Sequence, residues 1–248
     1  DINGISNNVL RQLNTSFIAA MSSNQISNLN TAKIKVLSSA QIRAIETEDL
    51  VTMSSDQLQA LGTLQVSSLS TDQIQALGTD QINKLTSDQV KALTTAQGSV
   101  ISSNQLSAMT TDQIRAFSAS LLNSLTSDAV HIMDSAALAA LTTNQIRGLS
   151  TTFIDTLASD QIQNLSTDQL SALTTRQFNV LGTDDLSGLS TDKIAGITSN
   201  QLSGITTTLL QAFNTDQMAA LTATQVKGLS AASMGQLLDA QVAKLSAS

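Results

Sequence analysis

The side chains best able to do chemistry in this sequence are one histidine and two small groups of acids. His131 is the only histidine, and Asp128 lies three residues before it. A histidine acts as a catalytic base or a metal ligand only where several partners converge on it. The sequence around His131 supplies no such set. We therefore expect His131 to be a surface residue at a variable position of the chain.

The acidic groups are Glu46, Glu48 and Asp49, and then the pair Asp184 and Asp185. Oxygen-rich clusters suit calcium, but the ligand spacing of a calcium-binding loop is absent, so a solvated acidic face is the preferred interpretation. Serine is abundant without a G-x-S-x-G nucleophile motif. We predict no catalytic residue, no metal site and no cofactor, and we do not expect an enzyme.

An eight-residue repeat runs from Ile5 to the last residue without an insertion or a deletion. Position 1 of the octad recurs from Ile5 to Leu245, and all 31 instances are Leu, Ile, Met or Phe. Position 6 is apolar in 29 of 30 octads, with Gly98 as the exception. Such a period is typical of stacked units that contact mainly their neighbours. We therefore expect residues 1–248 to form one continuous repeat domain.

Each octad carries the signature of a helix start. Position 2 is Ser, Thr, Asn, Asp or Gly in 28 of 31 octads, and these are the preferred N-cap residues. Position 5 is Gln in 18 of 30 octads, which completes a capping box in segments such as S-T-D-Q at residues 70–73. In this frame Leu69 and Ile74 are placed to form a hydrophobic staple.

The frame predicts a seven-residue helix from position 3 to the next position 1, about 10 Å long. Helices this short do not persist alone, so positions 1 and 6 must be buried against adjacent octads. Acids at position 4 and bases at position 7 predict exposed pairs such as Asp88 with Lys91 and Asp112 with Arg115. Small residues at position 8 permit close approach of neighbouring backbones. The predicted fold is an all-α solenoid of short capped helices, one per eight-residue repeat.

Composition limits the alternatives. Hydrophobic residues make up 41% of the chain and recur in a fixed frame, which favours folding over disorder. With five Phe and no Trp or Tyr, the core must be aliphatic. The net charge of −7 and the scattered basic residues argue against nucleic acid as a partner. No apolar run approaches the roughly 20 residues that span a bilayer, so we expect no membrane insertion.

Five octads depart from the pattern at position 5, where an apolar residue replaces glutamine. Position 5 must therefore be partly buried, at a boundary between the core and either solvent or another chain. The preferred interpretation is that these side chains enlarge the local core, and lateral contact between solenoids is the alternative. The five residues are Val9, Phe17, Leu121, Phe153 and Leu209.

The two ends of the sequence fit together as one octad, because residues 245–248 followed by residues 1–4 read L-S-A-S-D-I-N-G. Either the segment was cut from a longer array, or separate subunits stack head to tail and complete each other's split octad. A contact of the second kind does not close on itself and generates filaments. The residues expected at this subunit interface are Ile2, Gly4, Ile5, Leu237, Val242 and Leu245.

The octads L-S-T-D-Q-I-Q-A, L-G-T-D-Q-I-N-K and L-T-S-D-Q-V-K-A at residues 69–92 resemble the octapeptide arrays of very large secreted or surface proteins of Gram-negative bacteria. These proteins are often labelled adhesins or haem-utilisation proteins. The resemblance covers the whole chain and implies an extracellular structural or adhesive array. It implies no catalytic residue.

The leading functional hypothesis is therefore an extracellular or cell-surface structural protein that forms a filament, sheath or stalk. Its principal partner is then itself, as a head-to-tail homopolymer. The alternative is an adhesive or binding repeat module whose Thr, Ser, Gln and Asp side chains engage a polysaccharide such as a cell-surface glycan, a cell surface or ice.

Overall fold

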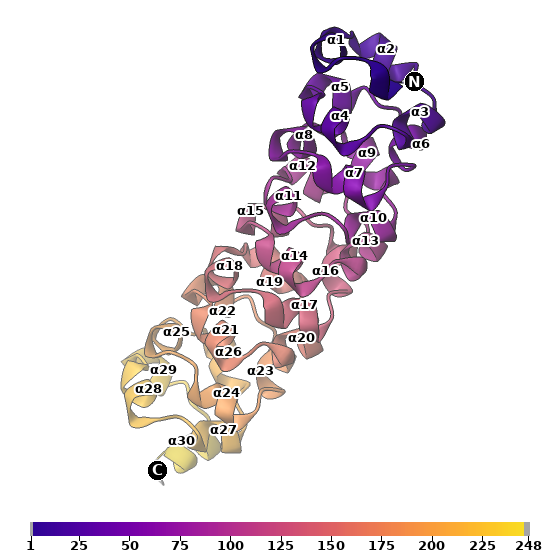
Figure 1. The fold of residues 1–248 in the computed structure, drawn as a ribbon. Coiled ribbons are helices and arrows are strands. Elements are labelled where there is room, and N and C mark those ends of the chain that lie inside the picture. The colour runs from indigo at the N-terminus through magenta and orange to yellow at the C-terminus, as the bar shows by residue number, and fades with distance from the viewer. Residues whose placement is uncertain (1, 246–248) are drawn as a thin grey trace. The chain divides into compact units, whose positions relative to one another are not determined.

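The computed structural model describes residues 2–245, and the secondary structure of these residues consists of short helices without a strand (Figure 1). Every α-helix begins at position 3 of an octad, so each octad contributes one helix. The predicted fold class, an all-α solenoid of short capped helices, is confirmed.

The chain divides into two compact units, Asp1–Ile132 and Met133–Ser248, and the octad frame continues through both. The elements of unit 1 are η1 (Ile2–Gly4), α1 (Asn7–Gln12), α2 (Thr15–Ala19), α3 (Ser23–Ser27), α4 (Thr31–Val36), α5 (Ser39–Arg43), α6 (Thr47–Leu50), α7 (Ser55–Ala60), α8 (Thr63–Ser68), α9 (Thr71–Ala76), α10 (Thr79–Ile82), α11 (Ser87–Lys91), α12 (Thr95–Gly98), α13 (Ser103–Ala108), α14 (Thr111–Ala116), α15 (Ala119–Leu122) and α16 (Ser127–His131). The helices of unit 2 are α17 (Ser135–Ala140), α18 (Thr143–Gly148), α19 (Thr151–Thr156), α20 (Ser159–Asn164), α21 (Thr167–Ala172), α22 (Thr175–Phe178), α23 (Thr183–Ser187), α24 (Thr191–Ala195), α25 (Ser199–Ser203), α26 (Thr207–Gln211), α27 (Thr215–Ala219), α28 (Ala223–Gly228), α29 (Ala231–Met234) and α30 (Asp239–Leu245).

The helix starts follow the predicted capping scheme. At α9 the N-cap Ser70 has extended backbone, with φ −70° and ψ 163°, and forms a capping box with Gln73. Where Gly62 or Gly78 replaces the hydroxyl residue, the glutamine still accepts a hydrogen bond from the N-cap N–H. The glutamine half of the box therefore survives loss of the hydroxyl half.

The helices end earlier than the sequence predicted. Most have four to six residues instead of seven, and only α30 has the expected seven. At α7 the chain leaves the helix when Leu61, at position 1 of the next octad, takes extended backbone with φ −63° and ψ 130°. No residue of the described part has a positive φ, so these ends do not need a left-handed glycine. Position 1 thus serves as a helix end as well as a core residue.

Within each unit the chain winds in coils, and helices three apart in the sequence pack on each other. Examples are α5 with α8 and α11 with α14 in unit 1, and α18 with α21 and α25 with α28 in unit 2. Positions 1 and 6 form the aliphatic core, and Leu69 and Ile74 of the expected staple are both buried. Burial against neighbouring coils supplies the stability that helices of one turn lack.

Small residues at position 8 let neighbouring coils approach closely, as predicted. In unit 2, a Cβ added to Gly228 would lie 2.9 Å from the backbone oxygen of Ser199 and 3.1 Å from its Cα. A Cβ on Gly204 would meet the side chain of Thr175, which has the same separation along the chain. This separation is longer than three octads and shorter than four. One coil therefore spans between three and four octads.

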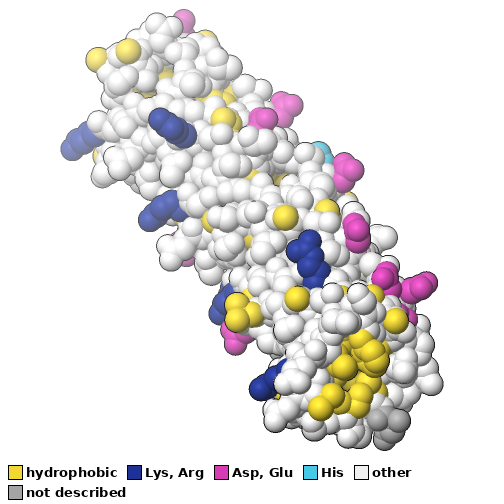
Figure 2. Space-filling view, turned by 90° about the horizontal axis from the view of Figure 1, so that it is seen from above, with side chains coloured by type: hydrophobic (Ala, Val, Ile, Leu, Met, Phe, Trp, Pro, Cys, Tyr) yellow, Lys and Arg dark blue, Asp and Glu magenta, His cyan; other side chains and the backbone are white. Residues whose placement is uncertain are grey.

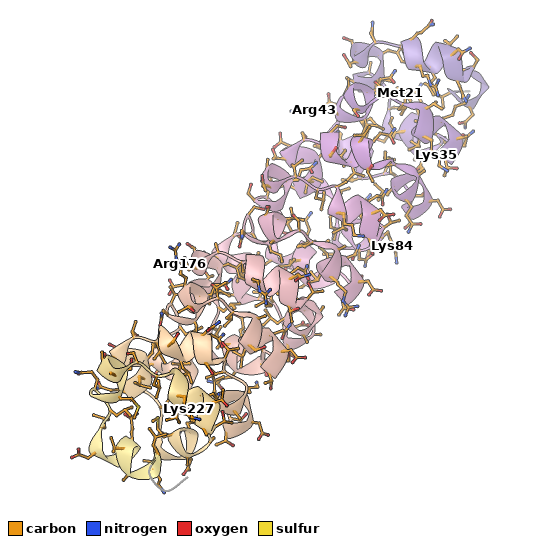
Figure 3. All side chains as sticks on the ribbon, turned by 90° about the vertical axis from the view of Figure 1, so that its left-hand side faces the viewer. Met21, Lys35, Arg43, Lys84, Arg176 and Lys227 are labelled. Atoms are coloured by element: carbon orange, nitrogen blue, oxygen red, sulfur yellow. The ribbon has the colours of Figure 1, made fainter. Side chains whose placement is uncertain are left out.

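Charged side chains lie on the outside of both units. The predicted ion pairs are confirmed, with Lys91 Nζ 3.7 Å from Asp88 Oδ1 and Arg115 Nη1 3.6 Å from Asp112 Oδ1. All four side chains are more than half exposed, so each pair stabilises the fold by well under about 1 kcal/mol. The basic residues that Figure 3 shows at the surface are Lys35, Arg43, Lys84, Arg176 and Lys227. None of the helices that the structure describes has the length and apolar character needed to cross a membrane.

The close approach at position 8 can be tested with one added methyl group. We expect Gly228→Ala to lower the free energy of unfolding by about 1–3 kcal/mol, because the backbone of Ser199 must move. Alanine normally stabilises a helix relative to glycine, so the sign itself is informative. The matched control is Gly78→Ala, whose new Cβ meets no atom closer than 4.0 Å. Urea unfolding of both variants measures the difference, and equal losses would contradict close contact at position 8.

The register of the repeat is tested by deletions. Removing residues 109–116 deletes a complete octad and keeps every later residue in frame with the coil before it. Removing Gln113 alone shifts all later octads by one residue and turns the apolar face of one helix away from the core. We expect the single deletion to cost far more stability than the eight-residue deletion, measured by thermal unfolding in circular dichroism. Equal losses would rule out an uninterrupted solenoid.

Candidate functional site

The residues with chemical potential do not form a catalytic centre. His131 and Asp128 are both exposed on and beside the last turn of α16. Among residues 2–245, no group of three or more His, Cys, Asp or Glu side chains is placed to hold a metal ion. The expectation that His131 lies on the surface is confirmed.

The acidic groups are not simply solvated faces, and this part of the sequence interpretation was wrong. Glu46 and Glu48 are exposed, but Asp49 is buried and accepts a hydrogen bond of 2.5 Å from the Ser23 hydroxyl. Asp185 is half-buried and accepts a hydrogen bond of 2.6 Å from Ser159. Both aspartates occupy position 5 of their octads. Position 5 therefore faces the preceding coil, whatever residue it carries.

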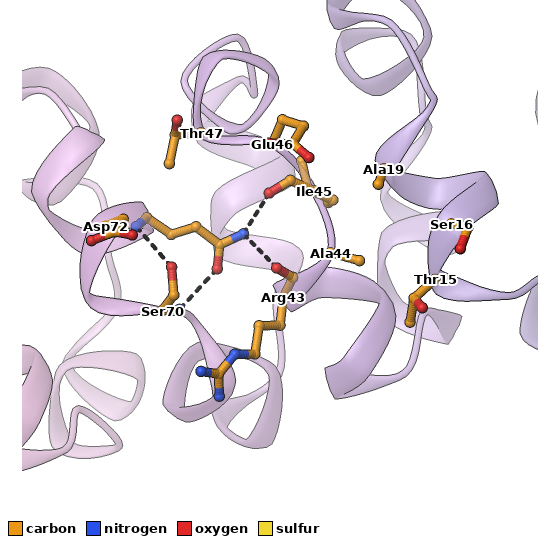
Figure 4. A pocket seen from close by; sticks show the side chains of 11 residues that line it. Thr15, Ser16, Ala19, Arg43, Ala44, Ile45, Glu46, Thr47, Ser70 and Asp72 are labelled. Atoms are coloured by element: carbon orange, nitrogen blue, oxygen red, sulfur yellow. Dashed lines mark hydrogen bonds between the residues drawn. The ribbon is translucent and has the colours of Figure 1, made fainter.

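A hollow of about 360 Å³ lies beside α9 in unit 1 (Figure 4). Its walls carry the cationic side chain of Arg43 and the carboxylates of Glu46 and Asp72. The remaining lining residues are Thr15, Ser16, Ala19, Ala44, Ile45, Thr47, Ser70 and Gln73. The hollow is open to solvent, and at its edge Gln73 already uses its side-chain amide in the fold. Its importance is that it exposes this glutamine interaction to view.

Gln73 joins two levels of structure through its side-chain amide. Its Oε1 accepts a hydrogen bond of 2.9 Å from the Ser70 N–H, which caps its own helix. Its Nε2 donates to the carbonyl oxygens of Ile42 at 3.1 Å and Ile45 at 2.8 Å, in the preceding coil (Figure 4). The side chain is 1% exposed. One buried amide thus caps a helix and holds two coils together.

The same arrangement recurs with constant spacing. In unit 1, Gln89 donates to the carbonyl oxygens of Leu58 and Leu61, 31 and 28 residues earlier, at 2.7 and 2.8 Å. In unit 2, Gln169 donates to those of Leu138 and Leu141 over the same separations, at 2.8 Å each. Further glutamines that bond both carbonyls in this register are Gln41, Gln57, Gln65, Gln97, Gln105, Gln113, Gln177, Gln201, Gln217, Gln225 and Gln241. We call this set of bonds the glutamine interface.

Lysine can replace glutamine as the donor to the preceding coil. Lys33, at position 5, is 9% exposed, and its Nζ donates to the carbonyl oxygen of Ile5, 28 residues earlier. Lys193 donates to the carbonyl oxygen of Gln163 in the same way. No octad has glutamate at position 5, although the chain is acidic. A glutamate could accept the capping bond but could not donate to the carbonyls.

The apolar departures at position 5 have two outcomes. Leu121, Phe153 and Leu209 are 1%, 4% and 4% exposed, so the expectation that they enlarge the core is confirmed. For Val9 and Phe17 the expectation was wrong, because they are 49% and 43% exposed. Both lie in the first coil of unit 1, where no earlier described octad covers position 5. Hydrophobic side chains gather on this end of unit 1 (Figure 2).

The last coil of unit 2 also exposes apolar side chains, but from different positions. At position 6, Leu210 and Met218 are fully buried, whereas Met234 is 39% and Val242 46% exposed. Leu238, in place of a polar N-cap residue, is 50% exposed. A position 6 side chain is therefore covered by the coil that follows it, and a position 5 side chain by the coil that precedes it.

The residues predicted at a subunit interface all lie in these two terminal coils. Ile2, Ile5, Leu237 and Leu245 are half-buried, and Gly4 and Val242 are exposed. Asn3 holds the first octad in place, donating to the Asn28 carbonyl at 2.7 Å and accepting from the Asn30 N–H at 3.0 Å. The proposed joining octad also includes residues 1 and 246–248, which lie outside the described residues. The interface itself stays a prediction.

Comparison with known families supports an array of repeats. The ALTTAQ repeat family model matches residues 42–79, 69–95, 84–119 and 131–167, so matches fall in both units. A search of curated proteins found no match to the chain.

The glutamine interface predicts a large penalty for losing one buried amide. Gln89→Met keeps the size of the side chain but leaves the carbonyls of Leu58 and Leu61 without this donor, and we expect a loss of about 2–4 kcal/mol in the free energy of unfolding. Gln25→Met is the matched control, because Gln25 caps Ser22 but is exposed at the first coil. We expect it to cost at most about 1 kcal/mol. Urea titrations followed by circular dichroism compare the two, and similar losses would show that the glutamines act only as caps.

Proposed function

We propose that this chain is a structural repeat protein that self-associates end to end into a filament, sheath or stalk outside the cell. The array of octads and the ALTTAQ matches support a repeat protein in general. The extracellular setting is proposed from the resemblance to octapeptide arrays of secreted and surface proteins.

The observation that carries the proposal is the directional character of the glutamine interface. Each coil presents amide donors to the coil before it and carbonyl acceptors to the coil after it, as Gln89 and Leu58 illustrate. An interface with one donor side and one acceptor side joins any number of identical coils, and a contact of this heterologous kind generates open filaments. Regular propagation suits a mechanical role.

Burial of apolar surface gives the association its driving force. Val9 and Phe17 at one terminal coil and Leu238 and Val242 at the other are between 43% and 50% exposed. Removing such side chains from water contributes roughly 25 cal/mol per Å² of apolar surface. Terminal coils that expose this surface are therefore expected to stack.

Self-association is tested by light scattering and negative-stain electron microscopy over a range of concentrations. We expect unbranched filaments whose mean length grows with protein concentration, because the interface is open at both ends. A chain that stays monomeric at the highest concentration reached would contradict the proposal.

A side-surface variant serves as the control. Leu64 on α8 is the most exposed of the large hydrophobic residues, at 77%, and it lies away from the terminal coils. Leu64→Asp should leave filament length unchanged. Loss of filaments in this variant would show that association is lateral.

A further inference from the structure

Two apolar surfaces of the structure complement each other in chemistry and in position within the repeat. The first-coil face consists of Val9, Phe17 and Gln25, which are the position 5 residues of three octads in unit 1. The last-coil face consists of Met234 and Val242, which are position 6 residues of unit 2. In the interior of each unit, position 5 and position 6 are the two sides of the coil-to-coil contact.

We propose that the first-coil face docks on the last-coil face of a second copy of this chain and continues the glutamine interface between subunits. This inference rests on the proposed function, self-association, and adds the surfaces, the register and the polarity of the joint. The occupant of each face is thus a coil of the same repeat.

Interior octads show how an apolar position 5 residue is accommodated. Leu209 stands in the same register to Phe178 and Leu181 as each interface glutamine does to the two residues whose carbonyls it bonds. All three side chains are at most 4% exposed. A position 5 leucine is therefore covered in the register in which glutamines bond to carbonyls. Val9 and Phe17 carry the same kind of side chain, with nothing described over them.

The register between subunits follows from the same spacing, counted through the octad that the sequence predicts across the joint. In this register the residue opposite Phe17 is Met234 of the second copy, and the residue opposite Gln25 is Val242 of the second copy. Phe17 and Met234 are 43% and 39% exposed in the single chain. The joint therefore brings one exposed apolar side chain onto another.

Gln25 supplies the polar part of the joint. Its Oε1 already accepts a hydrogen bond of 2.9 Å from the Ser22 N–H, as in the interior octads. Docking places its Nε2 where Gln57 Nε2 lies in the interior, 2.8 Å from the carbonyl oxygen of Ile26, a position 6 residue. The matching acceptor in the second copy is the carbonyl oxygen of Val242. This bond fixes rotation about the joint, because only one register aligns it with the apolar contact.

Neighbouring charges do not oppose docking at the first coil. Lys33 is the cationic side chain at position 5 in this coil, and its Nζ is engaged with the carbonyl oxygen of Ile5 and the Oδ1 of Asn7. It is 9% exposed. The first-coil face is therefore formed by two apolar side chains and one neutral amide, as an apolar partner surface requires.

The test uses two variants, each blocked at one face. Val9→Asp with Phe17→Asp blocks the first-coil face, and Met234→Asp with Val242→Asp blocks the last-coil face. Each variant alone should stay monomeric with unchanged helix content. An equimolar mixture should form one-to-one dimers and nothing larger in analytical ultracentrifugation, because one complementary pair of faces remains. Absence of dimers in the mixture, or filaments from either variant alone, would overturn the proposed joint.

The outcomes separate this inference from the proposed function. Filaments of the unaltered chain that persist in both blocked variants would support self-association but show that other surfaces carry it. A monomeric unaltered chain would contradict self-association itself. Gln25→Ala should weaken association about tenfold, which corresponds to about 1.4 kcal/mol, without preventing it. An unchanged association constant would remove Gln25 from the joint.

A crosslinking experiment keeps the proposal testable if an aspartate variant fails to fold. The chain has no cysteine, so Phe17→Cys with Met234→Cys introduces one thiol at each face. Under mild oxidation we expect a ladder of covalently linked chains on a denaturing gel. The control pair, Leu64→Cys with Met234→Cys, should give no ladder, since Leu64 lies on the side of unit 1. Equal ladders from both pairs would contradict the proposed register.

Discussion

The structure depends on one side-chain amide used twice. A glutamine at position 5 caps its own helix through Oε1 and bonds two carbonyls of the preceding coil through Nε2, as Gln73 does. Helices of about one turn leave backbone carbonyls at their ends that the helix itself cannot satisfy. A buried carbonyl without a donor costs about 1–3 kcal/mol, so the amide meets a need that recurs at every helix end. The local rule that starts a helix is therefore also the rule that sets the spacing between coils.

This double role explains which substitutions the repeat accepts. Lysine at Lys33 and Lys193 keeps the donor to the preceding coil, and leucine at Leu121 or Leu209 replaces the polar contact with apolar burial. Aspartate at Asp49 and Asp185 reverses the polarity and accepts from a serine hydroxyl 26 residues earlier. In each case the replacement still engages the preceding coil. A scaffold built on such an interface extends by adding octads, which is why a structural function suits it better than a localised site.

The sequence was sufficient to predict the fold class, because the caps and the apolar positions 1 and 6 act within one octad and its neighbours. It also placed His131 on the surface. The contact of Gln73 with Ile42 and Ile45 was not predicted, since it spans 28 to 31 residues and the number of octads per coil is not encoded in a local motif. The preference for glutamine over glutamate at position 5 was the available signal, because both residues complete a capping box but only glutamine donates. The same gap explains why Val9 and Phe17 were assigned to the core: their burial depends on which coil precedes them.

The most direct test of the glutamine interface is hydrogen exchange of glutamine side-chain amides, followed by nuclear magnetic resonance on protein labelled with ¹⁵N at glutamine Nε2. The interface predicts that the buried amides of residues such as Gln73, Gln89 and Gln169 exchange only when the coils separate, whereas the exposed amide of Gln25 exchanges as fast as a free side chain. Slow exchange confined to the buried position 5 glutamines is the expected result. Uniformly fast exchange of all glutamine amides in the folded protein would contradict the central role of these bonds.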